Sequence, residues 1–346
     1  MAATSQAVAG ATTSANYWDD KSLKLYFNSS SDFSLDTNGA KKYKKQATAP
    51  GEFVTQLQKH LIELNYLSGT SDGYYGSTTK RAVLRFQRHA KRVYRMKKAG
   101  TADDVKTITF NGAANGICDH TTAQEIQNWL KNSWVLPLGR FKFVSIGNGK
   151  LRSDAAMAFN TVKSSIKSKG GTLDGPYGDT TRSIGFRKHT GGNSLYSLHY
   201  TGRAVDLQQA LAGGKNQRYY VVKEMISGDT YWRIYCKTDK QDGTQGTKIP
   251  KLKGIKYYSL FDKKMYQLPE VYYLDITTIL ENNGFIRIKS HSNWKTNSKG
   301  LEWWHYLYNK DLQKTFEDEM ELVGYSEEVL RKNGWKTNAQ LDHKPG

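Results

Sequence analysis

Two short segments of the sequence contain side chains that could bind a metal ion. One reads S-L-H-Y-T-G-R-A-V-D and contains His199 and Asp206; the other reads E-W-W-H and runs from Glu302 to His305. A catalytic zinc site takes three nitrogen or oxygen ligands from the protein and leaves one position open for water. The two histidines and the aspartate can fill this set, which would leave Glu302 to move protons. The segments alone leave open that the histidines are two unrelated surface residues.

The spacing within each segment limits how the backbone can run. Asp206 is an odd number of residues after His199, so a single straight strand would point the two side chains to opposite faces. Gly202 lies between them and is the natural place for a bend. Glu302 also precedes His305 by an odd number of residues, and we therefore expect Glu302 at the lip of the site, before a regular strand begins.

The surrounding sequence predicts the elements that must position these residues. Residues 140–145 alternate as a strand, and apolar periodicity predicts helices over residues 153–169 and 274–283, each followed by glycine. A turn D-G-P-Y-G-D-T-T begins at Asp174 and has the spacing of D-G-Y-Y-G-S-T-T at Asp72. Because the flanking residues differ, we interpret the two as similar turns and not as a second repeat.

The first metal-binding segment matches the pattern S-x-H-x-x-G-x-A-x-D at every fixed position, and E-x-W-H follows downstream. The matching positions are Ser197, His199, Gly202, Ala204 and Asp206. With these motifs the chain resembles the zinc D-Ala-D-Ala carboxypeptidase and L-alanyl-D-glutamate endopeptidase family, which includes vancomycin-resistance D,D-peptidases and phage endolysins. The resemblance implies an α+β peptidase domain with an antiparallel sheet. It also implies one Zn²⁺ per chain, held by His199, Asp206 and His305.

Two further elements extend this resemblance over roughly residues 153–308. The family carries a glycine, an aromatic residue and an arginine before the first ligand, and the chain offers these at residues 185–187. It also carries Gly-Phe before the last motif, which matches residues 284–285. The interval between the two motifs is longer than in the family, and residues 219–275 fill it with aromatic, strand-like segments and hairpins. We expect substrate choice to diverge in this insertion.

The resemblance also implies roles for individual side chains. Glu302 would take a proton from the zinc-bound water and pass it to the leaving amine. Arg187 would polarise the scissile carbonyl and stabilise the oxyanion, although the nearby Arg182 could serve instead. His189 and His291 are the other histidines near the motifs, and we do not expect them to be ligands.

Three more residues are expected to contact substrate: Ser197, Trp303 and Trp304. Ser197 would orient the ligand loop and contact substrate without reacting, because the motif places no base to activate it. Trp303 and Trp304 would form the wall and the core of the cleft.

Residues 53–89 have the pattern of a small helical module. Val54, Leu57, Leu61 and Leu64 fall on one helical face, a Gly-rich turn follows, and Ala82, Val83 and Phe86 form the stripe of a second helix. This segment resembles the three-helix peptidoglycan-binding module that many wall hydrolases carry, and residues 121–129 could complete it. Its wall-binding residues would be those on the exposed loop, Asp72, Tyr74 and Tyr75.

The second helix continues into a strongly basic run. Residues 77–100 contain nine lysines and arginines and no acidic residue, which indicates either a solvated face or a contact with a polyanion. Over the whole chain, 51 lysines and arginines against 32 aspartates and glutamates give a formal net charge of +19. This charge favours anionic partners such as polymers of the bacterial envelope. Nucleic acid is the weaker choice, because no recognised nucleic-acid motif is present.

Composition also bears on compartment and delivery. Cys118 and Cys236 are too few for a disulfide scaffold, and we expect two buried free thiols. No apolar run approaches the ~20 residues that span a bilayer. The N-terminal segment has no basic region followed by an apolar one, so we expect no ordinary signal peptide. Action in the cell wall or periplasm would then require delivery by lysis or by an injection or secretion device.

The sequence therefore predicts a monomer with an N-terminal arm over residues 1–48, a helical peptidoglycan-binding domain over 49–135, a zinc peptidase domain over 140–325 and a tail over 326–346. The arm could contain an accessory strand or two, and the insertion covers roughly 208–272. The expected function is cleavage of the peptidoglycan stem peptide, with the bond left open. The alternatives are a catalytically silent wall-binding component of a phage tail or injection apparatus, and a zinc peptidase for other peptides.

Overall fold

The computed structural model describes residues 16–28, 34–35, 41–44, 51–184, 196–250, 253–313, 315–336 and 339. The chain divides into two compact units, residues 1–137 and 138–346. No helix in the described ranges is long and apolar enough to cross a membrane. Both cysteines are buried and free, Cys118 in the first unit and Cys236 in the second.

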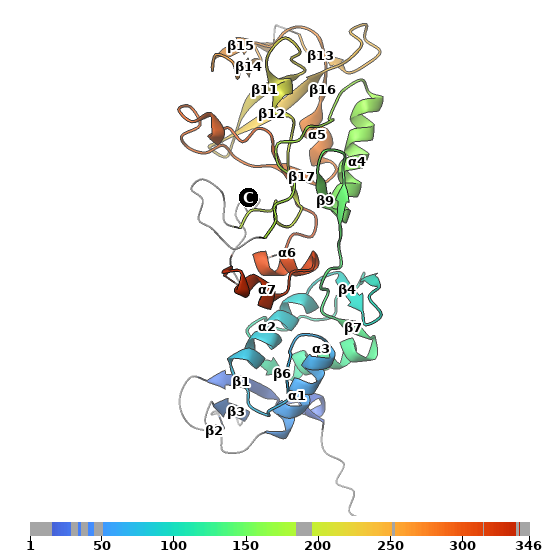
Figure 1. Ribbon diagram of the computed structural model, residues 1–346, viewed down its shortest axis with the longest axis vertical. Coiled ribbons are helices and arrows are strands. Elements are labelled where there is room, and N and C mark those ends of the chain that lie inside the picture. The colour runs from blue at the N-terminus through green and yellow to red at the C-terminus, as the bar shows by residue number, and fades with distance from the viewer. Residues whose placement is uncertain are drawn as a thin grey trace, which may run out of the picture. The chain divides into compact units, whose positions relative to one another are not determined.

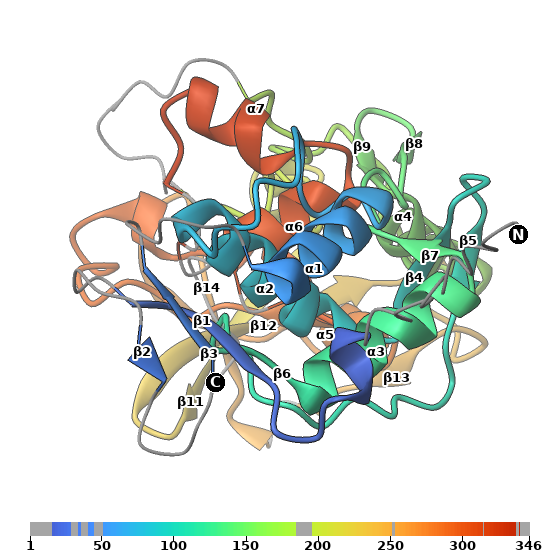
Figure 2. The same cartoon turned by 90° about the horizontal axis from the view of Figure 1, so that it is seen from below.

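The first unit is built on three helices, α1 (Glu52–Glu63), α2 (Ser77–Ala90) and α3 (His120–Lys131), which lie together in Figure 2. The apolar stripes predicted for the first two helices form its core, where Leu57, Leu61 and Phe86 are fully buried. Asp119 caps α3 by accepting a hydrogen bond from the backbone N–H of Thr122.

Short strands complete this unit. One sheet has the order β2 (Ser34–Leu35), β3 (Lys41–Lys44), β1 (Lys24–Asn28) and β6 (Cys118–Asp119), and the other has the order β5 (Ala102–Asp104), β4 (Tyr94–Lys97) and β7 (Trp134–Val135). The sequence-based boundary placed residues 16–28 in an arm, but Tyr17, Leu23 and Leu25 are buried in the core of the unit. These apolar side chains are removed from water by packing against the helices, so the segment is part of the fold of the first unit.

The second unit mixes helices with antiparallel sheets (Figure 1). A three-stranded sheet has the order β10 (Ala204–Asp206), β18 (His305–Tyr308) and β17 (Phe285–Arg287), and β8 (Phe143–Ser145) pairs with β9 (Lys150–Arg152). The predicted insertion forms most of a six-stranded sheet. Its order is β13 (Thr247–Lys248), β16 (Tyr272–Asp275), β12 (Asp229–Lys237), β11 (Tyr219–Ile226), β14 (Lys256–Tyr258) and β15 (Met265–Gln267).

Helices α4 (Ser153–Ser168) and α5 (Ile276–Glu281) supply the helical side of the core in this unit. Ala155, Phe159, Val162 and Ile166 recur at helical spacing along α4 and are buried, together with side chains from both sheets. Two short helices follow the last strand, α6 (Phe316–Leu322) and α7 (Glu327–Lys332). The mixed helix and antiparallel-sheet architecture confirms the predicted α+β class, and the predicted helices are present with slightly shorter limits.

Candidate metal centre

The structure brings the three predicted metal ligands together in the second unit. Candidate ligand atoms of His199, Asp206 and His305 all lie within 4.8 Å of one another. Nδ1 of His305 is 2.7 Å from Oδ1 of Asp206, and Nε2 of His199 is 3.4 Å from the same oxygen. The two imidazole rings meet edge to face, with centroids 4.9 Å apart. Their convergence excludes the interpretation of two unrelated surface histidines.

Strand pairing places two of these side chains. Asp206 and His305 are direct partners across the antiparallel pair β10 and β18. Directly opposed residues on one face of such a pair have neighbouring side chains, which accounts for the short contact.

A tight turn places the third ligand. Gly202 has φ +69°, and its N–H donates to the carbonyl of His199, as the N–H of Arg203 donates to that of Leu198. A Cβ on Gly202 would lie 2.6 Å from the ring of Phe143 and 2.7 Å from the backbone nitrogen of Arg152. The position therefore requires glycine for conformation and for space. The bend predicted at Gly202 is confirmed.

The imidazole of His199 is oriented by a backbone contact. Its Nδ1 lies 3.3 Å from the carbonyl oxygen of Thr180, which can accept a hydrogen bond only from a protonated Nδ1. This tautomer leaves the lone pair on Nε2, which is buried and has no hydrogen-bond partner among the described residues. A buried, unpaired nitrogen facing a carboxylate and a second imidazole suits a metal ion. The donor set of two imidazoles and one carboxylate is one that zinc accepts.

Backbone hydrogen bonds from the turn that begins at Asp174 hold the candidate ligands in place. The N–H of Asp206 donates to the carbonyl of Asp179 (2.8 Å), and the N–H of Gly178 donates to that of Asp206 (2.9 Å). Together with Thr180, these contacts hold both His199 and Asp206. Sequence reasoning found this turn through its D-G-P-Y-G-D-T-T pattern but gave it no role in the site.

The electrostatics of Asp206 favour its charged form. Burial acts to raise the pKa of this carboxyl, but its contacts with His199 and His305 outweigh burial and hold the pKa well below the usual range. The side chain is therefore ionised at neutral pH and offers a charged oxygen to a metal ion. If a metal ion bound here, it would replace the proton shared by Asp206 and His305, and both side chains would act as its ligands.

Glu302 lies beside the ligands with an unusual backbone conformation. Its φ is +57°, and its carbonyl accepts a hydrogen bond from the N–H of His305 at 3.2 Å. Burial raises the pKa of Glu302, and the charge of His305 opposes that rise. Nε2 of His291 is 3.5 Å from the Glu302 carboxylate. Among the described residues, His291 is not one of the three side chains that could hold the metal ion. Because β18 begins at His305, Glu302 precedes the strand, as its spacing predicts.

The arginine expected from the resemblance, Arg187, lies outside the described residues, as does His189. Arg182 is described and lies at the edge of the site. Its N–H donates to the carbonyl of His199, and its Nε donates to Oδ2 of Asp179 at 2.6 Å. Nη1 of Arg182 is buried without a hydrogen-bond partner in the described part of the chain, and its charge acts to lower the pKa of Glu302. Arg182 is thus an arginine beside His199 whose Nη1 has no hydrogen-bond partner in the described part of the chain.

The other three predicted substrate contacts differ in their environment. Ser197 is buried, and its Oγ accepts a hydrogen bond from the N–H of His199 at 3.3 Å, which makes it a loop-orienting residue. Trp303 is only 2% exposed and packs in the core beside Tyr219, so the prediction of substrate contact is corrected for this residue. Trp304 is partly buried and packs against the same core, with some of its surface exposed.

The predicted wall-binding loop of the first unit also needs a correction. Tyr75 is 1% exposed, and its hydroxyl donates to the carbonyl of Gly116 at 2.9 Å, so it is a core residue. Asp72 stabilises the loop by accepting hydrogen bonds from Gln58 and from the backbone of Tyr74. Tyr74 keeps an intermediate exposure and remains the aromatic ring of this loop that a ligand can reach.

The basic run of the first unit includes a structural residue as well. Arg95 is 1% exposed, and its guanidinium donates to the carbonyls of His89 and Ala90 at the end of α2. It also lies over the ring of Trp129, 4.7 Å from the centroid. Arg95 therefore caps the helix end and is not available to a polyanion.

A family model described as a putative peptidoglycan binding domain matches residues 50–92. No curated protein and no solved structure matches the chain. The match confirms the predicted module in the first unit and indicates association with the bacterial cell wall. The family match does not cover the second unit, so its assignment as a peptidase stays a prediction based on the candidate metal site.

Proposed function

We propose that the protein is a zinc-dependent peptidase that cleaves the stem peptide of bacterial peptidoglycan. The observation that carries the proposal is the convergence of His199, Asp206 and His305, with the buried Nε2 of His199 turned toward the other two. The peptidoglycan-binding domain supplies the substrate class, because it would hold the second unit near wall peptides.

The chain's own residues would divide the work as follows. His199, Asp206 and His305 would hold the ion, and the chemistry that zinc supplies when bound is activation of a water whose pKa falls to about 7. Glu302 would accept the proton at its carboxylate and pass it to the leaving nitrogen, a role that suits a carboxyl whose pKa is raised by burial. Arg182 or Arg187 would donate to the carbonyl oxygen as it gains charge.

Metal content tests the site directly. We expect one zinc per purified chain by elemental analysis, and loss of that zinc in His199→Ala and His305→Ala. Full zinc occupancy in either variant would refute the ligand assignment. His60→Ala is a matched control, because this histidine lies in the first unit, where its Nδ1 is 3.1 Å from the hydroxyl of Tyr17.

Digestion of purified sacculi tests the reaction and identifies the bond. Mass spectrometry of the released fragments should show new termini within the stem peptide, and their identity distinguishes D-Ala-D-Ala, L-Ala-D-Glu and cross-bridge cleavage. A protein that binds zinc and sacculi but releases no fragment would favour the catalytically silent wall-binding component. Cleavage of unrelated peptides at equal rates would favour a general zinc peptidase.

A further inference from the structure

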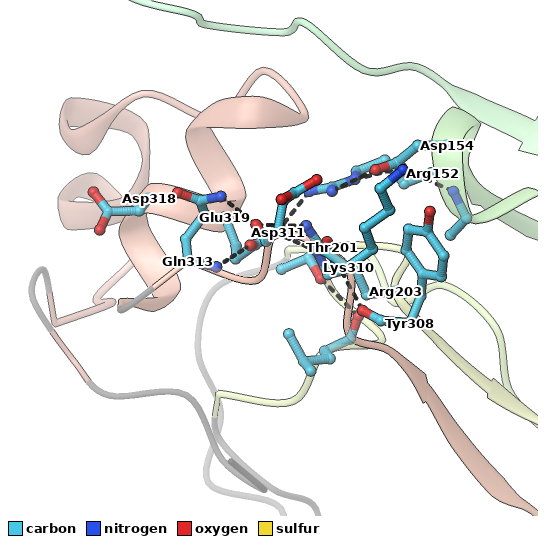
Figure 3. Close-up of polar contacts among 12 residues, drawn as sticks. Arg152, Asp154, Thr201, Arg203, Tyr308, Lys310, Asp311, Gln313, Asp318 and Glu319 are labelled. Atoms are coloured by element: carbon cyan, nitrogen blue, oxygen red, sulfur yellow. Dashed lines mark hydrogen bonds and ion pairs between the residues drawn. The ribbon is translucent and has the colours of Figure 1, made fainter. Parts of the chain in front are cut away.

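A buried group of charged side chains lies next to the strands β10 and β18, and none of its members is a fixed position of the motifs described above. The side chains of Arg152, Arg203 and Glu319 are each 0% exposed. Oε2 of Glu319 accepts a hydrogen bond from Nη1 of Arg152 at 2.6 Å and from Nε of Arg203 at 2.7 Å, as Figure 3 shows. A fourth member, Asp154, pairs with Arg152 at 2.8 Å. Two arginines and two carboxylates balance in charge, which such deep burial requires.

Arg203 connects this group to both ligand strands. It directly precedes β10, between His199 and Asp206 in the sequence. Its Nη1 donates to the carbonyls of Tyr308 and Lys310, both at 2.8 Å, and its own carbonyl accepts from the N–H of Tyr308 at 2.7 Å (Figure 3). The guanidinium thus joins the start of β10 to the end of β18.

Arg152 and Glu319 hold neighbouring segments in place. The N–H of Arg152 donates to the carbonyl of Gly202 at 2.9 Å, at the turn that brings His199 back toward Asp206. The second carboxylate oxygen of Glu319 accepts from the N–H of Gln313 at 2.7 Å, which ties down the chain beyond β18. Glu319 therefore orients both arginines from α6 and touches none of the three ligands.

We propose that Glu319 is a positioning residue of the metal centre. Glu319 holds the guanidinium of Arg203 in position. Arg203 in turn keeps β10 and β18 in the register in which Asp206 lies opposite His305. Glu319 lies beyond residues 153–308, the segment that resembles the peptidase family, so the functional unit extends at least through α6. The inference rests on the proposed function for the presence of a metal. It adds that tight metal binding requires Glu319 as well as the three ligands.

The test measures metal affinity in the full chain, with Zn²⁺ and with Co²⁺ as a spectroscopic probe. Glu319→Gln keeps the shape of the side chain and removes its charge. We expect affinity to fall about 10- to 100-fold, the range typical for partners that orient metal ligands. Glu224→Gln is the matched control, because Glu224 also lies between two arginines, Arg233 at 2.5 Å and Arg287 at 2.6 Å, neither of which is on a ligand strand. We expect its metal affinity to be unchanged.

A double variant separates positioning from stability. Arg152→Gln with Glu319→Gln restores the charge balance but leaves Arg203 without its carboxylate partner. We expect its thermal unfolding temperature to recover relative to Glu319→Gln, while metal affinity stays low and the Co²⁺ spectrum stays altered. If Glu319→Gln does not fold, the affinity of the double variant decides.

Two results would overturn the inference: wild-type metal affinity in folded Glu319→Gln or the double variant, or an equal loss of affinity in Glu224→Gln. Absence of Zn²⁺ and Co²⁺ binding by the wild-type chain is a different result. It would refute the proposed function, and with it the premise of the inference.

Discussion

The turn at Gly202 gives a prediction whose size can be worked out from the structure. In Gly202→Ala, a residue with a side chain must keep φ near +69°, which costs roughly 1–2 kcal/mol. Its Cβ would also lie 2.6 Å from the ring of Phe143 and 2.7 Å from the backbone nitrogen of Arg152. Overpacking of this kind costs about 1–3 kcal/mol. The sum predicts a loss of about 2–5 kcal/mol in the free energy of unfolding of the second unit.

Two other glycines separate the two contributions. Gly214 has φ +76°, but a Cβ there would meet nothing within 4 Å, so Gly214→Ala should show only the conformational cost of roughly 1–2 kcal/mol. Gly213 has an extended backbone and open space around it, so Gly213→Ala should be neutral or stabilising by up to about 1 kcal/mol.

The assay must report on the second unit alone, because two units need not unfold together. Hydrogen exchange measured by mass spectrometry at increasing urea concentrations gives the midpoint for peptides from α4 and β18. Zinc content of the same samples reports on the ligand turn, and we expect Gly202→Ala to lose zinc before it loses all protection in α4. If Gly202→Ala is no less stable than Gly214→Ala, the close approach to Arg152 does not matter and the reasoning fails.

Three further outcomes are expected. Glu302→Gln should keep its zinc but lose about 10²- to 10⁴-fold in turnover of a soluble stem peptide, and unchanged turnover would assign the proton to another group. Tyr75→Phe should destabilise the first unit by about 1 kcal/mol, through loss of its hydrogen bond to Gly116, while pelleting with sacculi stays unchanged; weaker pelleting of the folded variant would return Tyr75 to the binding surface. Burial acts to raise the pKa of Asp154, but its hydrogen bonds and ion pair with Arg152 hold that pKa below the ordinary value of an aspartate carboxyl. Its stabilisation is then present above the unfolded-state pKa and lost as pH falls through the lower folded-state value. Thermal unfolding of Asp154→Asn between pH 2 and 6 should therefore show lower stability at the upper end and a weaker dependence on pH, and an unchanged pH dependence would contradict the assigned shift.

The features of the candidate metal centre that depend on local sequence could be predicted. The motif identifies the candidate ligands, and the odd spacing between His199 and Asp206 correctly requires a bend at Gly202. The opposition of Asp206 to His305 could not be predicted in the same way, because strand register depends on pairing between segments far apart in the chain. Thr180 was missed for a related reason. It acts through a backbone carbonyl, which any residue type supplies.

The first unit shows the same limit. The spacing of its leucines predicts the core, because one helical face is a local property. The sequence predicts Tyr75 on an exposed loop, because it lies in the turn D-G-Y-Y-G between two helices. Its actual partner is the carbonyl of Gly116, which belongs to a loop 41 residues later. The core positions of Tyr17 and Leu25 likewise depend on a surface that the rest of the unit provides.

The long interval between Asp206 and His305 is compatible with an intact centre for a physical reason. The two residues are partners on adjacent strands, so the intervening chain needs only to leave β10 and return to β18. Each doubling of a connecting segment adds only about 0.6 kcal/mol of closure entropy when the segment is unstructured. Here the interval largely forms its own antiparallel sheet, whose buried residues Trp232, Ile234 and Cys236 share a core with α4. Burial of those side chains offsets the entropy of the longer connection, so the length of the insertion can vary while the opposition of the two ligands is kept.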